Sequence, residues 1–110
     1  DAMYNNNNPY HNHKHACDVL QSMNYFMNSI IFNKINIFDK FSILISGAAH
    51  DVGHPGHNNG FEINTESELS ITYNDQSVLE NYHISLAWRT LNKTNCNILK
   101  NFNKKQRQRF

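Results

Sequence analysis

The chain has 110 residues, of which 39% are hydrophobic and 17% charged, and its formal net charge is +1. This length accommodates one small domain or part of one. Four Gly and two Pro are too few for a collagen-like or Pro/Gly-rich disordered chain, and no apolar run approaches the roughly 20 residues that a membrane-spanning helix needs. The two cysteines, Cys17 and Cys96, predict no disulfide framework, which favours a reducing compartment.

Charge is unevenly distributed along the chain. Residues 1–80 carry three Lys and nine acidic residues, a charge of −6, whereas residues 81–110 carry seven Lys or Arg and no acid, a charge of +7. A basic segment of this kind either contacts nucleic acid or forms a solvated helix face. We favour the solvated face, because no Tyr or Trp interleaves residues 104–110 as a stacking platform would require.

Two long helices are predicted in the first half of the chain. The run Asn5–Asn8 indicates a flexible, Asn-rich lead-in over residues 1–8, and Pro9 suits a first helical turn. Apolar residues then recur every three or four positions from residue 10 to about residue 31, the period of a helix with one buried stripe. They are Ala16, Val19, Leu20, Met23, Phe26, Met27, Ile30 and Ile31. Residues 33–37 form a linker, and Asp39 is the predicted N-cap of a second, apolar helix that ends at His50 and Asp51.

The second half reads as a loop followed by further helices. Residues 53–60 contain three Gly and one Pro, which predicts a loop, and its His and Asn residues make it a candidate site. Thr65 and Glu68 have the spacing of a capping box, so a short third helix is expected there. Asp75 is the predicted N-cap of a helix over residues 77–91, and residues 104–110 resemble the beginning of another helix. With no β-hairpin signal, the predicted fold class is all-α.

Histidines and a carboxylate suggest a metal site. His11 and His15 are four residues apart on a predicted helix, so both side chains would leave one face. Such a pair also arises by composition or as a surface metal scavenger. His50 and Asp51, however, close an apolar helix, where an imidazole and a carboxylate cost stability unless something pairs with them. Imidazole suits Zn²⁺ and a carboxylate also ligates Mg²⁺ or Mn²⁺, so together these residues predict an incomplete, mixed-ligand hydrolytic centre.

Several separated motifs carry a family resemblance. They are residues 9–12 (Pro-Tyr-His-Asn) with His15-Ala16 and 18–21, then 50–56 (His-Asp-Val-Gly-His-Pro-Gly), Asn59, Phe61, 63–65, 67–69, 73–75, 77–81, His83 and 104–108. In this order and spacing they resemble the catalytic domain of class I 3′,5′-cyclic-nucleotide phosphodiesterases, of the HD-domain superfamily. The resemblance implies that residues 1–110 are the N-terminal part of this multi-helix domain, with residues 9–110 as its metal-binding helical part.

The resemblance also implies residue roles. His11 would be the general acid that protonates the departing O3′ of the cyclic phosphate. His15, His50 and Asp51 would bind Zn²⁺, and Asp51 would also bridge to a second ion, Mg²⁺ or Mn²⁺.

Four further residues would line the pocket or support it. His54 would lie near the water between the metals, Glu80 would contact His11 and the waters of the second ion, and Asn59 would brace Tyr10. The chain departs from the family pattern at Gly53, where many relatives have Asp, and at Tyr82, where many have His. These departures put the metal affinity and pH optimum in doubt more than the reaction.

The implied function is two-metal hydrolysis of cAMP, cGMP or both to 5′-monophosphates in cyclic-nucleotide signalling. The substrate would be the cyclic nucleotide, with no nucleic-acid or membrane contact from this segment, and the location intracellular, facing the cytosol. We expect the segment to be inactive alone, because the last metal-ligand Asp and the purine-binding Gln of the family would lie beyond Phe110. Alternatives are an HD-type phosphohydrolase acting on another phosphoester, or a non-catalytic nucleotide- or metal-binding module.

Overall fold

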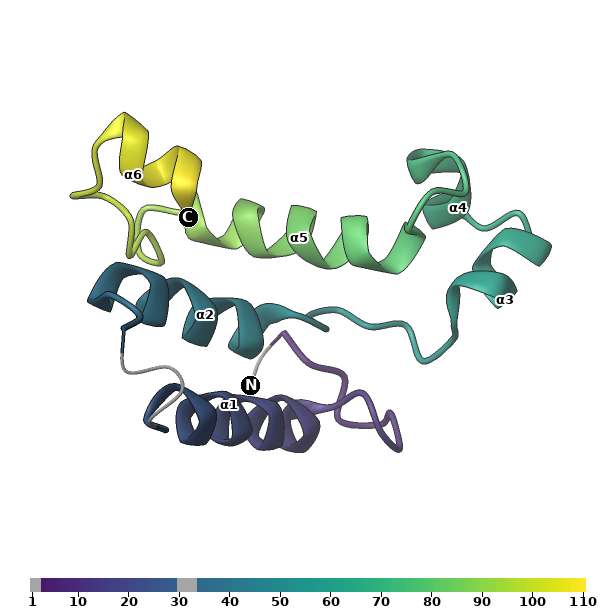
Figure 1. The fold of residues 1–110 in the computed structure, drawn as a ribbon. Coiled ribbons are helices and arrows are strands. Elements are labelled where there is room, and N and C mark those ends of the chain that lie inside the picture. The colour runs from purple at the N-terminus through teal and green to yellow at the C-terminus, as the bar shows by residue number, and fades with distance from the viewer. Residues whose placement is uncertain (1–2, 30–33) are drawn as a thin grey trace.

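The computed structural model describes residues 3–29 and 34–110, and within these it contains helices and no strand (Figure 1). This confirms the all-α prediction. The helices are α1 (His13–Met27), α2 (Ile37–Ala49), α3 (Asn59–Asn64), α4 (Glu68–Tyr73), α5 (Val78–Leu91) and α6 (Lys104–Arg109). In Figure 1, α2 runs between α1 and α5, while α3 and α4 lie at the N-terminal end of α5. None of these helices is long and apolar enough to cross a membrane.

Helix α1 begins later than the sequence pattern predicts. Asn12 is its N-cap and accepts hydrogen bonds from the main-chain N–H groups of Lys14 and His15. His11 therefore lies in the turn before the helix, and its expected place on the same helical face as His15 is wrong. Phe26 is 57% exposed, so the buried stripe is narrower than predicted. The predicted end of the helix at Ile30 and Ile31 lies outside the described residues.

The N-cap of α2 is Asn36 and not the predicted Asp39. Asn36 accepts from the main-chain N–H of Asp39 at 3.0 Å and donates its amide to the Asp39 carboxylate at 2.7 Å. Asp39 thus lies in the first turn of α2, where the positive end of the helix dipole stabilises a carboxylate. Near the other end of α2, a Cβ on Gly47 would collide with Met23 Sδ, so a small residue at position 47 allows α1 and α2 to pack closely.

The short helix α3 was not predicted. The expected loop over residues 53–60 ends at Asn58, whose side chain accepts from the Phe61 N–H at 2.8 Å and caps α3. Thr65, predicted to begin a helix, is instead the C-cap of α3, and Ser67 caps α4. Helices of six residues are too short for a hydrophobic period to define, and their existence depends on tertiary contacts.

Helix α5 follows its predicted span but is capped in an unexpected way. Ser77 is the N-cap in place of Asp75, has a left-handed backbone (φ 43°) and makes no side-chain capping bond. The free N–H of Leu79 in the first turn is satisfied by Asn59 Oδ1, 2.9 Å away. The cap therefore comes from α3, which holds the two elements together.

Residues 3–8, which lie in the predicted flexible, Asn-rich lead-in, are bonded to later parts of the chain. The main-chain N–H of Gly53 donates to the carbonyl of Met3 at 2.8 Å, and the Tyr4 hydroxyl donates to the carbonyl of Ala48 at 3.0 Å. Asn8 is only 8% exposed. These bonds hold the segment against the end of α2 and the loop that follows.

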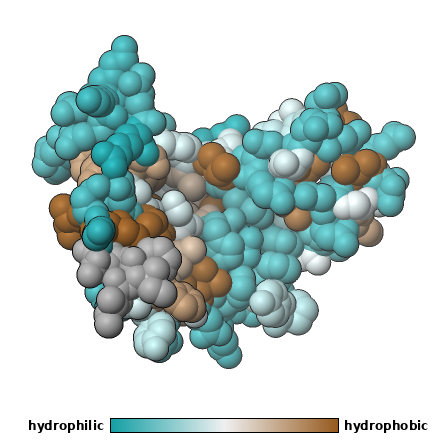
Figure 2. Space-filling view, in the orientation of Figure 1, coloured by the Kyte–Doolittle hydropathy of each residue, from teal (hydrophilic) through white to brown (hydrophobic). Residues whose placement is uncertain are grey.

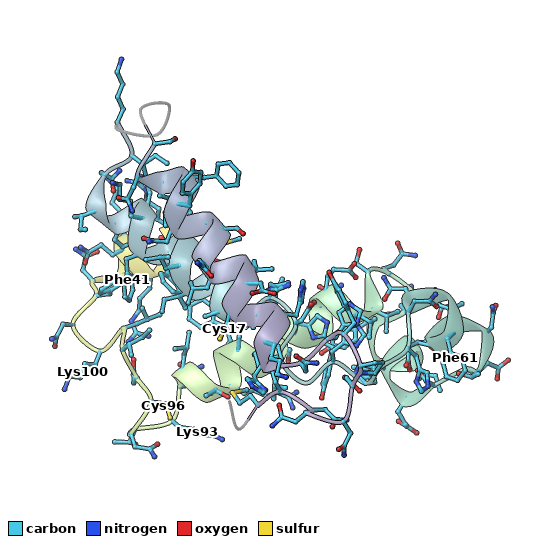
Figure 3. All side chains as sticks on the ribbon, turned by 90° about the horizontal axis from the view of Figure 1, so that it is seen from below. Cys17, Phe41, Phe61, Lys93, Cys96 and Lys100 are labelled. Atoms are coloured by element: carbon cyan, nitrogen blue, oxygen red, sulfur yellow. The ribbon has the colours of Figure 1, made fainter. Side chains whose placement is uncertain are left out.

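Apolar packing is divided between two regions. Ala16, Met27, Val52, Val78, Leu79 and Leu99 are the buried apolar residues of the described chain. Phe38, Phe41, Trp88, Phe102 and Phe110 form an aromatic cluster with ring centroids 5.4–6.2 Å apart. Apolar surface lies below α6 at one end of the molecule, and further apolar side chains are exposed at the other end, where α3 and α4 lie (Figure 2). Phe41 on α2 and Phe61 on α3 mark opposite ends of the molecule (Figure 3).

Candidate metal centre and active-site cavity

Three side chains from two helices converge on one point. His15 Nε2 lies 3.2 Å from His50 Nε2 and 3.4 Å from Asp51 Oδ2, and His50 Nε2 lies 3.0 Å from the same oxygen. His15 comes from the first turn of α1, while His50 is the C-cap of α2 and Asp51 follows it. The close packing of α1 on α2 brings these residues together across 35 positions of the chain.

The donor set fits a divalent metal. His50 Nδ1 lies 2.9 Å from the carbonyl of Gly47 and donates to it, which leaves the Nε2 lone pair of the neutral ring facing His15 and Asp51. A tetrahedral ion with ligand bonds of about 2.0–2.1 Å holds its ligand atoms about 3.3 Å apart. The observed separations of 3.0–3.4 Å agree with that geometry. His15, His50 and Asp51 are also the one group within the described residues whose ligand atoms could share an ion.

A third imidazole, that of His83 on α5, faces the same carboxylate. His83 is 4% exposed, and its Nδ1 donates to the carbonyl of Val52 at 2.8 Å. Its Nε2 then lies 3.8 Å from Asp51 Oδ1, the oxygen not directed at His15 and His50. His83 belongs to the motifs that carry the family resemblance, but no role was predicted for it. Its buried position on a helix of otherwise amphipathic pattern offered no local signal.

His54 is fixed as a hydrogen-bond donor. Its Nδ1 accepts the main-chain N–H of Gly56 at 3.0 Å, which places the ring proton of the neutral form on Nε2. Burial first, and the neighbouring His11 second, lower the pKa of His54 below its ordinary value. The ring therefore stays neutral near pH 7.

His11 lies directly on His54. The two rings are parallel within 3°, with centroids 3.8 Å apart. Tyr10 packs beside both predicted histidines, 5.0 Å from the His11 ring and 4.6 Å from the His15 ring, and remains 62% exposed. The turn before α1 therefore brings the predicted general acid to the same cavity as the metal group.

Asn59 and Glu80 form a second polar pair. Asn59 Nδ2 donates to the Glu80 carboxylate at 3.0 Å, and its Oδ1 accepts from Leu79. The Asn59 amide, which was expected to brace Tyr10, thus bonds to Leu79 and Glu80 of α5. This bond from Asn59, followed by one from the main-chain N–H of Glu80 itself, lowers the pKa of the Glu80 carboxyl. Glu80 remains ionised near neutral pH, and its carboxylate is bonded to Asn59 rather than to the expected His11.

The site residues surround a cavity of about 660 Å³. Its walls are made by five histidines, two acidic residues and part of the loop before α3: His11, His50, Asp51, His54, Gly56, His57, Asn58, Asn59, Leu79, Glu80 and His83. Of the predicted residues, Tyr10 and His15 lie outside this lining and next to it. A cavity of this volume accommodates a small-molecule ligand.

The fold and donor set define an all-helical protein with a histidine–aspartate candidate metal centre. Residues 10–110 match the family of 3′,5′-cyclic nucleotide phosphodiesterases. The chain belongs to this family, as its motifs predicted.

Individual relatives of this chain also carry the names of cyclic-nucleotide phosphodiesterases. The 3′,5′-cyclic-nucleotide phosphodiesterase regA of Dictyostelium discoideum is 46% identical over 109 residues, covering 96% of this chain and 14% of that protein. The dual 3′,5′-cyclic-AMP and -GMP phosphodiesterase beta of Plasmodium falciparum is 48% identical over 101 residues, covering 91% and 9%. The crystal structure of the phosphodiesterase domain of the RhoPDE fusion protein from the choanoflagellate Salpingoeca rosetta superposes with a TM-score of 0.92 at 39% identity, covering 98% of this chain and 34% of that one. The chain therefore spans about a third of the solved domain.

Proposed function

We propose that the protein containing this chain hydrolyses the 3′ phosphoester bond of cAMP, cGMP or both. Water adds to phosphorus, the P–O3′ bond breaks, and the O3′ leaving group takes up a proton to give the nucleoside 5′-monophosphate. The observation that carries the proposal is the convergence of His15, His50 and Asp51 beside the His11 ring. The names of the relatives, which include enzymes for both cyclic nucleotides, support the substrate class.

His15, His50 and Asp51 would hold a Zn²⁺ ion, and Asp51 would also contribute to a site for Mg²⁺ or Mn²⁺. Bound divalent ions supply charge neutralisation at phosphoryl oxygens and lower the pKa of a coordinated water. On the protein side, the Gly47 carbonyl keeps the His50 Nε2 lone pair directed at the ion site.

His11 is the proposed proton donor. The O3′ alkoxide is a poor leaving group, and a positioned acid accelerates such a step by about 10²–10⁴-fold. The His11 ring lines the cavity and lies flat on the His54 ring, which limits rotation of the His11 side chain. The Glu80 carboxylate lines the same cavity as the His11 ring.

His54 has a different proposed task from that of His11. Because the ring is neutral with its proton on Nε2, it donates a hydrogen bond into the cavity and does not supply a proton. A neutral donor there orients the attacking water or a phosphoryl oxygen.

The test is turnover by the purified full-length protein, with cAMP and cGMP as substrates and the 5′-monophosphates separated by chromatography. We expect loss of activity on treatment with a chelator, its return with Zn²⁺ plus Mg²⁺, and a fall in kcat of about 10²-fold or more for His11→Ala. His13→Ala is the matched control, because that ring lies next to Asn6, away from the cavity. Absence of turnover with metals supplied, or full activity of His11→Ala, would contradict the proposal. Tight nucleotide binding without turnover would indicate a binding module.

A further inference from the structure

We propose that Asn8 is the positioning residue that sets the general acid His11 against His54. This inference rests on the role of His11 in the proposed function. The side-chain amide of Asn8 donates to the main-chain carbonyl of His11 at 3.1 Å and to that of His54 at 2.8 Å. An amide nitrogen has two N–H groups, so one side chain satisfies two carbonyls from segments 43 residues apart in the chain.

Asn8 is itself buried and held in place by its neighbours. It is 8% exposed, and its main-chain carbonyl accepts from the Asn12 amide at 2.9 Å. Asn12 is the N-cap of α1, so Asn8 is tied to the start of that helix. On the loop side, a Cβ on Gly56 would lie 3.0 Å from Asn8 Oδ1, where glycine with φ +96° leaves room for the amide. The two hydrogen bonds from the Asn8 amide to the His11 and His54 carbonyls, here called the bridge, are therefore part of the buried structure and not a surface contact.

The bridge determines the stacking of the two rings. His11 lies in the turn before α1 and His54 in the loop after α2, and neither residue belongs to a helix. The parallel arrangement at 3.8 Å requires a fixed distance between these two backbones. Asn8 bonds to both of them directly. Displacement of a reacting group by about 1 Å can cost about 10²-fold in rate.

Asn8 acts only through the histidines. It does not line the cavity, so it does not meet the substrate, and it bonds to none of the three metal-group side chains. Loss of the bridge should therefore affect the proton-transfer step, whereas substrate binding and metal content should change little.

The experiment compares Asn8→Ala and Asn8→Asp in the full-length protein with Asn7→Asp, a matched control at a neighbouring exposed position. Rates are measured for the cyclic nucleotide and for bis(4-nitrophenyl) phosphate, whose nitrophenolate leaving group needs no proton. We expect kcat for the cyclic nucleotide to fall about 10- to 100-fold in both Asn8 variants, with KM and bound metal within about threefold of wild type. The rate with bis(4-nitrophenyl) phosphate should change less than threefold, and Asn7→Asp should behave as wild type.

An equal loss for both substrates would overturn the inference, since it would indicate general disruption of the site. Unchanged kcat for the cyclic nucleotide would also overturn it. A second measurement does not depend on activity: NMR cross-peaks between the ring protons of His11 and His54, expected in the wild type and weakened in Asn8→Ala. If the wild type fails to hydrolyse cyclic nucleotides, the proposed function fails, and these cross-peaks alone decide whether Asn8 positions the rings. Cross-peaks of equal strength in Asn8→Ala would then overturn the inference.

Discussion

His83 directs its Nε2 at Asp51 Oδ1 from 3.8 Å, on the opposite side of the carboxylate from His15 and His50. The His83 ring is held by its bond to the Val52 carbonyl, so it limits rotation of the carboxylate. Residues that orient a ligand commonly change metal affinity by about 10- to 100-fold when replaced. Because 3.8 Å is longer than a hydrogen bond, we expect the lower end of this range.

Two substitutions, His83→Ala and His83→Asn, separate the contact of His83 with Val52 from its contact with Asp51. His83→Ala should lower the free energy of unfolding by about 1–3 kcal/mol, since it leaves a buried carbonyl without a donor. His83→Asn can restore that donor and much of the stability, whereas Zn²⁺ affinity should stay about tenfold weaker in both variants. Denaturant unfolding and metal titration measure the two effects separately. His57→Ala, at a largely exposed ring, is the control, and wild-type metal affinity in His83→Asn would contradict the prediction.

Metal removal should lower the melting temperature. An ion that binds only the folded state stabilises it by about 2.7 kcal/mol at a concentration 100 times its Kd. We therefore expect Zn²⁺ to raise the melting temperature of the chelated protein and Asp51→Asn to reduce that rise strongly. His13→Ala, outside the metal group, should retain the full response. A Zn²⁺ response that persists in Asp51→Asn would show that stabilisation arises elsewhere.

Acid should destabilise the protein through His54. Its pKa is lowered in the folded state by burial, from an ordinary value of 6.5. In the window below 6.5, the unfolded chain binds a proton that folded His54 does not, so stability is lost as the pH falls through this value. We expect the free energy of unfolding, measured with a chelator present, to decrease between pH 7 and pH 5.

His54→Asn isolates this effect, because the Asn carbonyl can replace Nδ1 as the acceptor of the Gly56 N–H and does not titrate. The variant should show a flatter dependence on pH over that window, whereas His57→Asn should retain the wild-type slope. An unchanged slope in His54→Asn would assign the acid sensitivity to other groups.

Much of the fold was predictable from local patterns, whereas the caps were not. The periodicity of apolar residues identified α1, α2 and α5, because each buries one stripe against a neighbour. The N-caps at Asn36, Ser67 and Ser77 were missed, since other short polar side chains lie within a few residues of each. The start of α5 depends on Asn59 of α3, whose side chain accepts a hydrogen bond from the first turn of α5. Such a contact between distant residues leaves no local signal.

Some residues of the candidate site were also predictable from the sequence, whereas others were not. His15, His50 and Asp51 were predicted from residue chemistry and family motifs, and the structure brings them within 3.4 Å of one another. Asn8 and His83 were not assigned roles, because each acts on main-chain carbonyls that only the folded chain brings near. Asn8 in particular belongs to an Asn run whose composition indicated a flexible segment.

Gly53 and Tyr82, the two positions where the sequence was expected to depart from the family pattern, face each other. Gly53 has φ +72°, and a Cβ there would lie 3.0 Å from the Tyr82 hydroxyl and 2.5 Å from Leu86 Cδ2. A side chain at position 53 would therefore collide with α5 while also adopting an unfavourable left-handed backbone. The space beside Leu86 and Tyr82 therefore fits a glycine at position 53.

Gly53→Ala should consequently lower the free energy of unfolding by about 1–3 kcal/mol through overpacking and backbone strain. Gly60→Ala is the matched control, since its Cβ would meet Asn58 Oδ1 at 3.5 Å, an ordinary contact, in the first turn of α3. Denaturant unfolding of both variants, and of Gly53→Ala combined with Leu86→Ala, measures the effect. If the collision with Leu86 is the main cause, the two substitutions should cost less together than the sum of their separate effects. Strict additivity would leave the strained backbone of position 53 as the cause.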